Sequence, residues 1–226
     1  MAKLYIVATP IGNLQDITLR ALNVLKKVDL ILCEDTRQSK KLLDHYQIKK
    51  PLLSYHQHSK IKRINQIIEF LKKGKNLALI SDAGTPGISD PGNELIKKVL
   101  ERVSENVEIV PIPGPSALIT CASISGFPMD RFLFLGFPPK KKKRKKFFQN
   151  LINCQYPVIF YESPYRIKKT LKEIFFLLKG KPKKVVVCKE LTKKFEKIFR
   201  GDIEKVIKEI EKEKLKGEFV IILNNK

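Results

Sequence analysis

Residues 76–92 read NLALISDAGTPGISDPG, where a short apolar run passes directly into a segment that holds three glycines and two prolines. A tight turn needs one glycine, and two at most, so this segment has more backbone freedom than a turn requires. In open α/β sheets, ligands bind where loops leave the carboxyl ends of the strands. Glycine and proline at such a place let main-chain amides approach a ligand closely. The stretch therefore predicts an α/β sheet that binds a close-fitting small molecule at this strand end.

The rest of the chain repeats this alternation of short apolar runs and amphipathic helical patterns. Strands are predicted over 4–8, 30–34, 52–55, 77–81, 107–112, 157–162, 185–190 and 218–223. Helices are predicted after Asp16, near 38–46, over 61–73, after Asp90, after Ser163 and over 203–214. Caps are expected at Asp16, Asp90 and Asp202, with Pro91 as the first residue of its helix. The alternation is typical of α/β domains, with a mostly parallel sheet in the first half.

A hinge is predicted at PGPSA, residues 113–117, where two prolines flank a glycine before a new helix. We therefore expect two α/β domains, 1–115 and 116–226. The second half continues the pattern of the first, and no internal sequence repeat is visible.

The charge of the chain is one-sided, because 45 lysines and arginines stand against 23 acidic residues and give a net charge of +22. This excess favours a polyanionic partner such as nucleic acid, although a lysine-biased proteome would give the same count. The excess is densest in KKKKRKK, residues 140–146. Repulsion among like charges predicts a solvated loop there, and such a loop also suits phosphate binding. We expect a loop that faces RNA.

Several classes of protein are disfavoured by what the sequence lacks. Its four cysteines are far apart, without a CxxC pair, and are expected to be buried free thiols. His56 and His58 have no third ligand at metal spacing, so no metal site is expected. No apolar run approaches the roughly 18 residues of a membrane span, and the first residues are not a signal peptide, which predicts a soluble cytoplasmic protein. The P-loop pattern and the GxGxxG fingerprint are absent.

Asp82 is the one acidic residue at the predicted strand end inside the glycine-rich segment. Its carboxylate suits an amine or a ribose hydroxyl of a ligand, and it also suits an Asx turn within its own loop. Asp90 is expected to cap its helix and not to take part in chemistry. Unusual segments follow other predicted strands as well, namely TPIGN, DTR, PGPSA, ESP and KELT.

Six segments, in this order and spacing, resemble the bacterial ribosomal RNA small subunit methyltransferase I family: VATPIGNLQDIT, CEDTR, SDAGTPGISDPG, PIPGPSA, LGFPP and FYESPYR. The resemblance covers residues 4–223. It implies the tetrapyrrole-methylase fold, with two α/β domains and S-adenosylmethionine in the cleft between them. It further implies methylation of a cytidine ribose 2′-oxygen in the 16S ribosomal RNA of the small ribosomal subunit, and a homodimer.

By the same resemblance, ten residues are expected to contact the cofactor: Pro10, Ile11, Asp82, Ala83, Gly84, Thr85, Pro86, Ser116, Ala117 and Tyr161. Two departures from the pattern are visible. TPIGN stands where tetrapyrrole methylases carry a GxGxGD-like turn. Longer members continue past GEFV with a further segment, so the basic run 140–146 is expected to do more of the RNA contact here.

Methyl transfer to a ribose hydroxyl requires sulfur, methyl group and oxygen in line, and the removal of a proton. Charged candidates at predicted strand ends are Glu34, Asp35, Arg37, Glu162, Lys189 and Glu190. Of these we favour Asp35, Arg37, Lys189 and Glu190 for the acceptor side. A carboxylate beside a cation stays ionised, which weakens it as a base but orients it well.

Other roles for the same residues stay open. Arg37 is equally suited to an ion pair with Asp35, and Arg166 to one with Glu162. His56 titrates in a range that suits a base. Two other functions also compete, methylation of a small tetrapyrrole and non-enzymatic binding to the ribosome. The net charge argues against the first, and the second leaves the glycine-rich strand ends unexplained.

Overall fold

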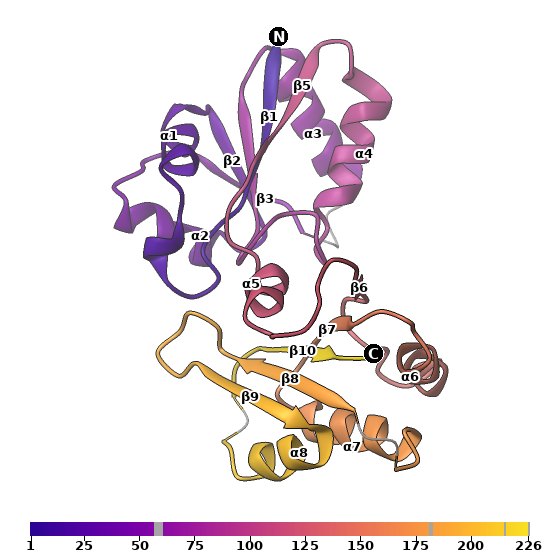
Figure 1. Ribbon diagram of the computed structural model, residues 1–226. Helices are drawn as coiled ribbons and strands as arrows, with labels where there is room; N and C mark the ends of the chain where they lie inside the picture. Colours follow the sequence, from indigo (N-terminus) through magenta and orange to yellow (C-terminus); the bar gives the residue numbers. More distant parts are fainter. Residues whose placement is uncertain (57–60, 181–182, 215, 226) are drawn as a thin grey trace. The chain divides into compact units, whose positions relative to one another are not determined.

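The computed structural model describes residues 1–56, 61–180, 183–214 and 216–225. The chain divides into two compact units, Met1–Ser116 and Ala117–Lys226 (Figure 1), and the division falls one residue from the boundary expected from the sequence. Each unit contains its own five-stranded sheet. Within the described ranges, no helix is both long and apolar enough to cross a membrane.

The sheet of the first unit is parallel at every pair of neighbouring strands, in the order β3-β2-β4-β1-β5. Its strands span Ala2–Val7 (β1), Leu30–Cys33 (β2), Leu52–Ser54 (β3), Leu77–Ile80 (β4) and Val107–Ile112 (β5). β2 and β4 are buried along their whole length, as expected for strands covered on both faces. The parallel sheet predicted for this half is confirmed.

Helices cover both faces of this sheet. They span Leu19–Lys27 (α1), Thr36–His45 (α2), Ile61–Lys72 (α3) and Gly92–Val103 (α4), and the 3₁₀ helix η1 spans Leu14–Asp16. α1 and α2 pack on one face, while α3 and α4 pack on the other (Figure 1). Since the strands are parallel, their carboxyl ends and the loops that follow them gather at one edge of the sheet.

Two helix starts in this unit differ from the prediction. α1 is capped by Thr18, whose hydroxyl accepts from the Ala21 amide at 3.0 Å, whereas Asp16 belongs to η1. α4 begins one residue later than predicted, at Gly92, where the Asp90 carboxylate accepts from the Gly92 amide at 2.8 Å. Neighbouring polar side chains compete for the free amides of a helix start, and sequence alone does not rank them.

The sheet of the second unit is mixed, with the strand order β6-β7-β10-β8-β9. Its strands span Leu133–Phe134 (β6), Val158–Glu162 (β7), Lys184–Lys189 (β8), Lys197–Asp202 (β9) and Phe219–Leu223 (β10). β6 and β7 are parallel, and the other neighbours are antiparallel. The second half continues the α/β pattern, as expected, but its sheet is mixed. The short connection between β8 and β9 can join only antiparallel strands, and neither β6 nor β9 is predicted from the sequence.

The helices of the second unit span Ala117–Ser123 (α5), Arg144–Ile152 (α6), Ile167–Leu177 (α7) and Ile203–Glu211 (α8). α7 begins at Ile167, later than the start predicted directly after Ser163, but its apolar stripe is buried and Gly180 follows at a φ of +78°, as expected. Asp202 takes the N-cap position of α8 without a side-chain hydrogen bond to the helix. α6 corrects the loop predicted over 140–146, because a helix begins at Arg144 inside this run.

Candidate functional site

Two strand ends of the first unit are joined through their main chains. The Thr9 amide donates to the Gly84 carbonyl at 2.9 Å, and the Gly84 amide donates to the Thr9 carbonyl at 3.0 Å. The Thr9 hydroxyl also donates to the Ser81 carbonyl at 3.0 Å. Gly84 has a φ of +83°, and a β-carbon there would lie 3.5 Å from the Ile11 side chain. Glycine therefore allows the loop after β4 to fold back against the loop after β1.

Asp90 holds the remainder of the loop after β4. Its carboxylate accepts from the Gly87 amide at 2.7 Å and from the Gly92 amide at 2.8 Å. The Asn93 side chain donates to the Gly87 carbonyl at 2.6 Å. A β-carbon on Gly92 would lie 2.8 Å from the Gly87 nitrogen, so the two backbones approach each other more closely than any larger residue allows. Asp90 thus has a structural role, as the sequence predicts.

Asp82 links the loop after β4 to the end of β2. Its carboxylate accepts from the Asp35 amide at 3.1 Å. Asp35 in turn binds the Arg37 guanidinium at 2.8 Å and 3.1 Å and caps α2 by accepting from the Arg37 amide at 2.8 Å. The ion pair foreseen for Arg37 is confirmed. The hydrogen bond from the Arg37 side chain lowers the pKa of Asp35 to about 2, so this carboxylate is ionised and weakly basic.

Glu34 has the opposite electrostatic setting. Burial raises the pKa of the Glu34 carboxyl, and the nearby carboxylates of Asp90 and Asp82 raise it further. Consecutive residues at the end of β2 therefore differ in proton affinity, with Glu34 the stronger proton acceptor and Asp35 the weaker one. The sequence names Glu34 as a candidate but gives no reason to rank it above Asp35.

The predicted cofactor residues of the first unit lie at this same edge. Pro10, Ile11, Gly84 and Pro86 are buried, whereas Asp82 and Ala83 are exposed. Thr85 is half-buried and donates its hydroxyl to the Pro115 carbonyl at 3.1 Å, next to Ser116. The structure therefore brings the loops after β1, β4 and β5 together. It leaves one acidic side chain of the β4 loop open to solvent.

Tyr161 and Ala117 are the predicted cofactor residues of the second unit. The Tyr161 ring packs against Phe134 and Phe137, with centroid distances of 5.0 Å and 5.3 Å. Burial raises the pKa of the Tyr161 hydroxyl, against which a backbone hydrogen bond with Leu118 acts. Leu118 follows Ala117 in the first turn of α5, so both predicted residues lie in one part of this unit.

Lys189 and Glu190, which follow one another at the end of β8, both form ion pairs within the second unit. The buried Lys189 amine lies 3.1 Å from the Glu213 carboxylate. Glu190 accepts from the Lys193 amine at 3.0 Å and from the Glu218 amide at 2.9 Å. Burial acts to raise the pKa of Glu190, but these hydrogen bonds outweigh it, and the pKa is lowered. These contacts of Lys189 and Glu190 are with residues of the second unit, and the role of these two side chains toward a substrate stays a prediction.

Glu162, at the end of β7, is the centre of a buried ionic network. Its side chain is fully buried and accepts from the Ser163 amide at 2.7 Å, from the Thr170 hydroxyl at 2.6 Å and from the Arg166 guanidinium at 2.7 Å. The Arg144 guanidinium lies 3.8 Å from the same carboxylate. The ion pair foreseen for Arg166 is confirmed. The sequence gives no sign of the second arginine, which comes from 18 residues earlier in the chain.

Arg144 corrects the picture of a uniformly solvated run over 140–146. It is 7% exposed, and its guanidinium donates to the Glu173 carboxylate at 2.7 Å, to the Thr170 hydroxyl at 2.6 Å and to the Pro139 carbonyl at 3.0 Å. Its lysine neighbours, in contrast, are exposed. Arg144 therefore fastens α6 to α7, and its guanidinium donates to acceptors of the protein itself.

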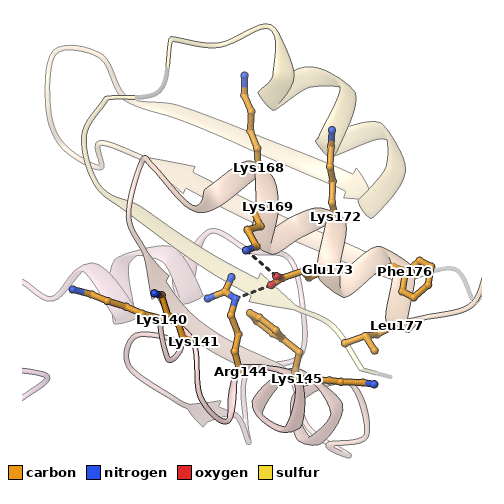
Figure 2. Close-up of a pocket in the computed structure, with 11 residues that line it drawn as sticks. Lys140, Lys141, Arg144, Lys145, Lys168, Lys169, Lys172, Glu173, Phe176 and Leu177 are labelled. Carbon is orange, nitrogen blue, oxygen red and sulfur yellow. Dashed lines mark hydrogen bonds and ion pairs between the residues drawn. The ribbon is translucent and has the colours of Figure 1, made fainter.

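A groove of about 960 Å³ lies between α6 and α7 (Figure 2). Its lining consists of seven cationic side chains, one carboxylate and three apolar side chains: Lys140, Lys141, Arg144, Lys145, Lys168, Lys169, Lys172, Glu173, Phe148, Phe176 and Leu177. The carboxylate, Glu173, is bound by Arg144 at 2.7 Å and by Lys169 at 3.9 Å. Cations thus dominate the lining of the groove, and apolar side chains make up the smaller part of it.

Metal ligands are not grouped in the described part of the chain, where no cluster of three His, Cys, Asp or Glu side chains suits an ion. His58, one of the two histidines considered from the sequence, lies outside the described residues. The four cysteines are free thiols, as predicted, but only Cys33, Cys121 and Cys188 are buried, whereas Cys154 is half-buried. Cys121 and Cys188 are buried with their sulfur atoms 2.9 Å apart.

Comparison with known proteins identifies full-length relatives. A family model for tetrapyrrole (corrin/porphyrin) methylases matches residues 3–207. The chain is 44% identical over 226 residues to the ribosomal RNA small subunit methyltransferase I of Thermotoga maritima, covering 100% of both chains. It is 47% identical over 222 residues to the protein of that name from Mycoplasmopsis pulmonis, covering 98% of this chain and 97% of the relative.

Solved structures with the same fold include methyltransferases of low sequence identity. One is uroporphyrin-III C-methyltransferase from Thermus thermophilus complexed with S-adenosyl homocysteine, at 16% identity and a TM-score of 0.65, covering 99% of this chain and 97% of that one. Another is cobalt precorrin-4 methyltransferase, at 20% identity and a TM-score of 0.70, covering 98% and 94%. At these identities the likeness concerns the fold.

Proposed function

Because the chain belongs to the ribosomal RNA small subunit methyltransferase I family, within the tetrapyrrole methylases, we propose that it methylates the ribose 2′-oxygen of a cytidine in small-subunit ribosomal RNA. The methyl donor is S-adenosylmethionine. Action in the cytoplasm and assembly as a homodimer are parts of the same proposal. The observation that carries it is the loop after β4, which is held by main-chain bonds and leaves Asp82 exposed.

The residues at the sheet edge of the first unit suit this donor. Gly84 has a φ of +83°, which favours glycine, whereas a β-carbon there would meet Ile11 and the Pro115 carbonyl only at ordinary contact distances of 3.5 Å and 3.8 Å. One Asp82 oxygen accepts from the Asp35 amide, and within the described residues the other has no hydrogen-bond partner. A ribose hydroxyl or an amine of the donor matches that free acceptor. Ala117 and Tyr161 are the proposed donor contacts of the second unit.

When bound, the donor supplies a methyl group made electrophilic by its positively charged sulfur. The protein must hold the ribose hydroxyl in line and dry, and must accept its proton as the oxygen–carbon bond forms and the sulfur–carbon bond breaks. We assign proton acceptance to Glu34, whose pKa is raised by burial. Asp35 and Arg37, locked in an ion pair, are proposed to orient the acceptor ribose, together with Lys189 and Glu190 of the second unit.

Transfer of a labelled methyl group from S-adenosylmethionine to small ribosomal subunits tests the proposal, when the modified nucleotide is mapped afterwards. Label on a cytidine 2′-oxygen supports it. Label on a base of the RNA overturns it. Methylation of an added tetrapyrrole without any methylation of RNA also overturns it. The same assay with naked ribosomal RNA shows whether the assembled subunit is needed.

The donor site and the base are separable by two variants. We expect Asp82→Ala to weaken binding of S-adenosylmethionine by roughly tenfold in calorimetry, since a lost hydrogen bond to a charged group is worth about 1.5 kcal/mol. We expect Glu34→Gln to preserve donor affinity and to lower the rate by roughly a hundredfold or more. Unchanged donor affinity in the first variant, or an unchanged rate in the second, contradicts the respective role.

A further inference from the structure

We propose that the groove between α6 and α7 binds the sugar-phosphate backbone of the RNA substrate and stacks one unpaired base on Phe176. The proposal rests on the function proposed above, but it concerns a separate surface, which lies within the second unit. It replaces the solvated loop expected over 140–146 with a groove that has two walls (Figure 2).

The wall on the α6 side carries charge that the protein does not use. Lys140, Lys141 and Lys145 are exposed, and in the part of the chain that the structure describes they form no ion pair. Uncompensated cations in a row are what a phosphate backbone requires, because binding releases the counterions of the nucleic acid.

On the α7 side of the groove, acceptors of the protein partly compensate the positive charge of the lysines. Lys172 lies 2.6 Å from the Glu211 carboxylate, Lys168 donates to the Glu211 carbonyl at 3.0 Å, and Lys169 lies 3.9 Å from Glu173. The side chains of Lys169 and Lys172 are 71% and 60% exposed, so a phosphate can still approach them. The two walls therefore differ in strength, and the α6 side is expected to carry more of the affinity.

The exposed aromatic side chain of Phe176 favours a nucleic acid over a ligand that offers phosphate alone. Phe176 is 80% exposed in the last turn of α7 and lines the groove beside the half-buried Leu177. An exposed aromatic ring next to a lysine-lined groove is the arrangement that single-stranded nucleic acids use, because bases stack on the ring while cations follow the backbone. A ligand that offered phosphate alone would have no use for this ring.

The groove is held open by the buried network beneath it. Arg144, at the start of α6, bonds to Thr170 and Glu173 of α7, so the two walls are joined by charged hydrogen bonds. A preformed groove binds with less loss of conformational freedom than lysines on a free loop. This explains why one cation of the run is buried while its neighbours are exposed.

The test compares two variants with equal loss of charge. In the groove variant, Lys140, Lys141 and Lys145 are each changed to glutamine. In the control variant, the exposed lysines Lys26, Lys27 and Lys49 of the first unit are changed in the same way. Binding to a fluorescently labelled single-stranded fragment of small-subunit ribosomal RNA is then measured over a range of salt concentrations, with donor affinity and circular dichroism as checks of the fold.

For the groove variant we expect the RNA dissociation constant to rise roughly tenfold or more, and the slope of log affinity against log salt to fall by about 2. The control variant should show a much smaller change in both quantities. Equal behaviour of the two variants overturns the groove, whatever the methylation assay shows.

Phe176→Ala separates stacking from charge. We expect it to weaken RNA binding roughly fivefold or more without changing the salt slope. Phe195→Ala is the matched control, since Phe195 is also exposed in the second unit, at 67%, but does not line the groove. An unchanged affinity of the Phe176 variant overturns the stacking contact. Failure of the unchanged protein to methylate any ribosomal RNA overturns the proposed function and not the groove.

Discussion

The loops that follow β4 and β7 are held in place by opposite means. In the first unit, hydrogen bonds to main-chain groups fix the loop, namely the paired bonds between Thr9 and Gly84 and those from the Gly87 and Gly92 amides to the Asp90 carboxylate. In the second unit, buried charges do so, because the Glu162 carboxylate accepts from the Ser163 amide and from the Arg166 guanidinium, which also donates to the Ser163 hydroxyl. One loop leaves its acidic side chain exposed, and the other uses its charged side chains internally.

This difference shows that charge in a sequence does not by itself indicate a ligand site. Of the charged residues at strand ends, Glu162, Lys189 and Glu190 are engaged in ion pairs within the second unit. The side chain of Asp82 accepts a single main-chain hydrogen bond. Side chains that are engaged in ion pairs have fewer donors and acceptors left for a ligand than the Asp82 carboxylate has.

Replacing Glu162 should have the largest effect, because it removes the carboxylate that holds the charged loop of the second unit. We expect Glu162→Gln to lower the free energy of unfolding by about 3–5 kcal/mol, because it leaves two arginines without their buried carboxylate. Urea unfolding measures the loss, and hydrogen exchange should localise it to the second unit. Glu69→Gln, in an exposed pair with Lys72, is the control and should change stability by less than about 1 kcal/mol. A loss as small as that of the control would show that the buried network is not needed.

Replacing Gly92 should break the backbone-held loop. We expect Gly92→Ala to cost about 2 kcal/mol, because the added β-carbon meets the Gly87 nitrogen at 2.8 Å, and to weaken donor binding as the loop shifts. Gly74→Ala is the control: its φ is +76°, but its surroundings are open, so it should cost about 1 kcal/mol and leave donor binding unchanged. Equal effects on donor binding would contradict a role for close backbone approach.

Protonation of Asp35 gives the smallest expected effect. Its pKa of about 2 in the folded protein lies below its ordinary value of 3.8, so the carboxylate stabilises the fold above about pH 4. This contribution should be lost as the pH falls from about 4 to 2, and Asp35→Asn should lack that part of the acid sensitivity. Urea midpoints across this range measure it. In an Arg37→Gln background, Asp35→Asn should change the acid sensitivity less. An effect as large as in the unchanged protein would show that the lowered pKa of Asp35 has another cause.

Much of the first unit is predictable from sequence, because its strands and helices have clear periodicities and its glycines indicate the proposed donor loop. The second unit is less predictable for physical reasons. β9 reads KIFRGD, in which two adjacent apolar residues stand between charged ones without the alternation of a strand, and α6 begins inside a run of like charges, which by itself favours a loop. The partner that makes helix favourable at Arg144 is Glu173, 29 residues away, and no local pattern reveals it.

The capping choices show the same limit on a smaller scale. Thr18 and Asp16 are two residues apart, and only the path of the chain before α1 decides which one meets the free amides. Likewise, Glu34 and Asp35 are neighbours in sequence, but burial raises the pKa of one and Arg37 lowers that of the other. Sequence supplies the candidates, and tertiary surroundings rank them.

The position of β10 has a consequence for the order in which the protein matures during its synthesis. β10 lies between β7 and β8 in its sheet, although it is the last strand along the described chain. A nascent chain therefore exposes the edges of β7 and β8 until residue 223 has left the ribosome, whereas all five strands of the first sheet are available once residue 112 has emerged. The half that holds the proposed donor loop can thus form on the ribosome well before the half that carries the basic groove.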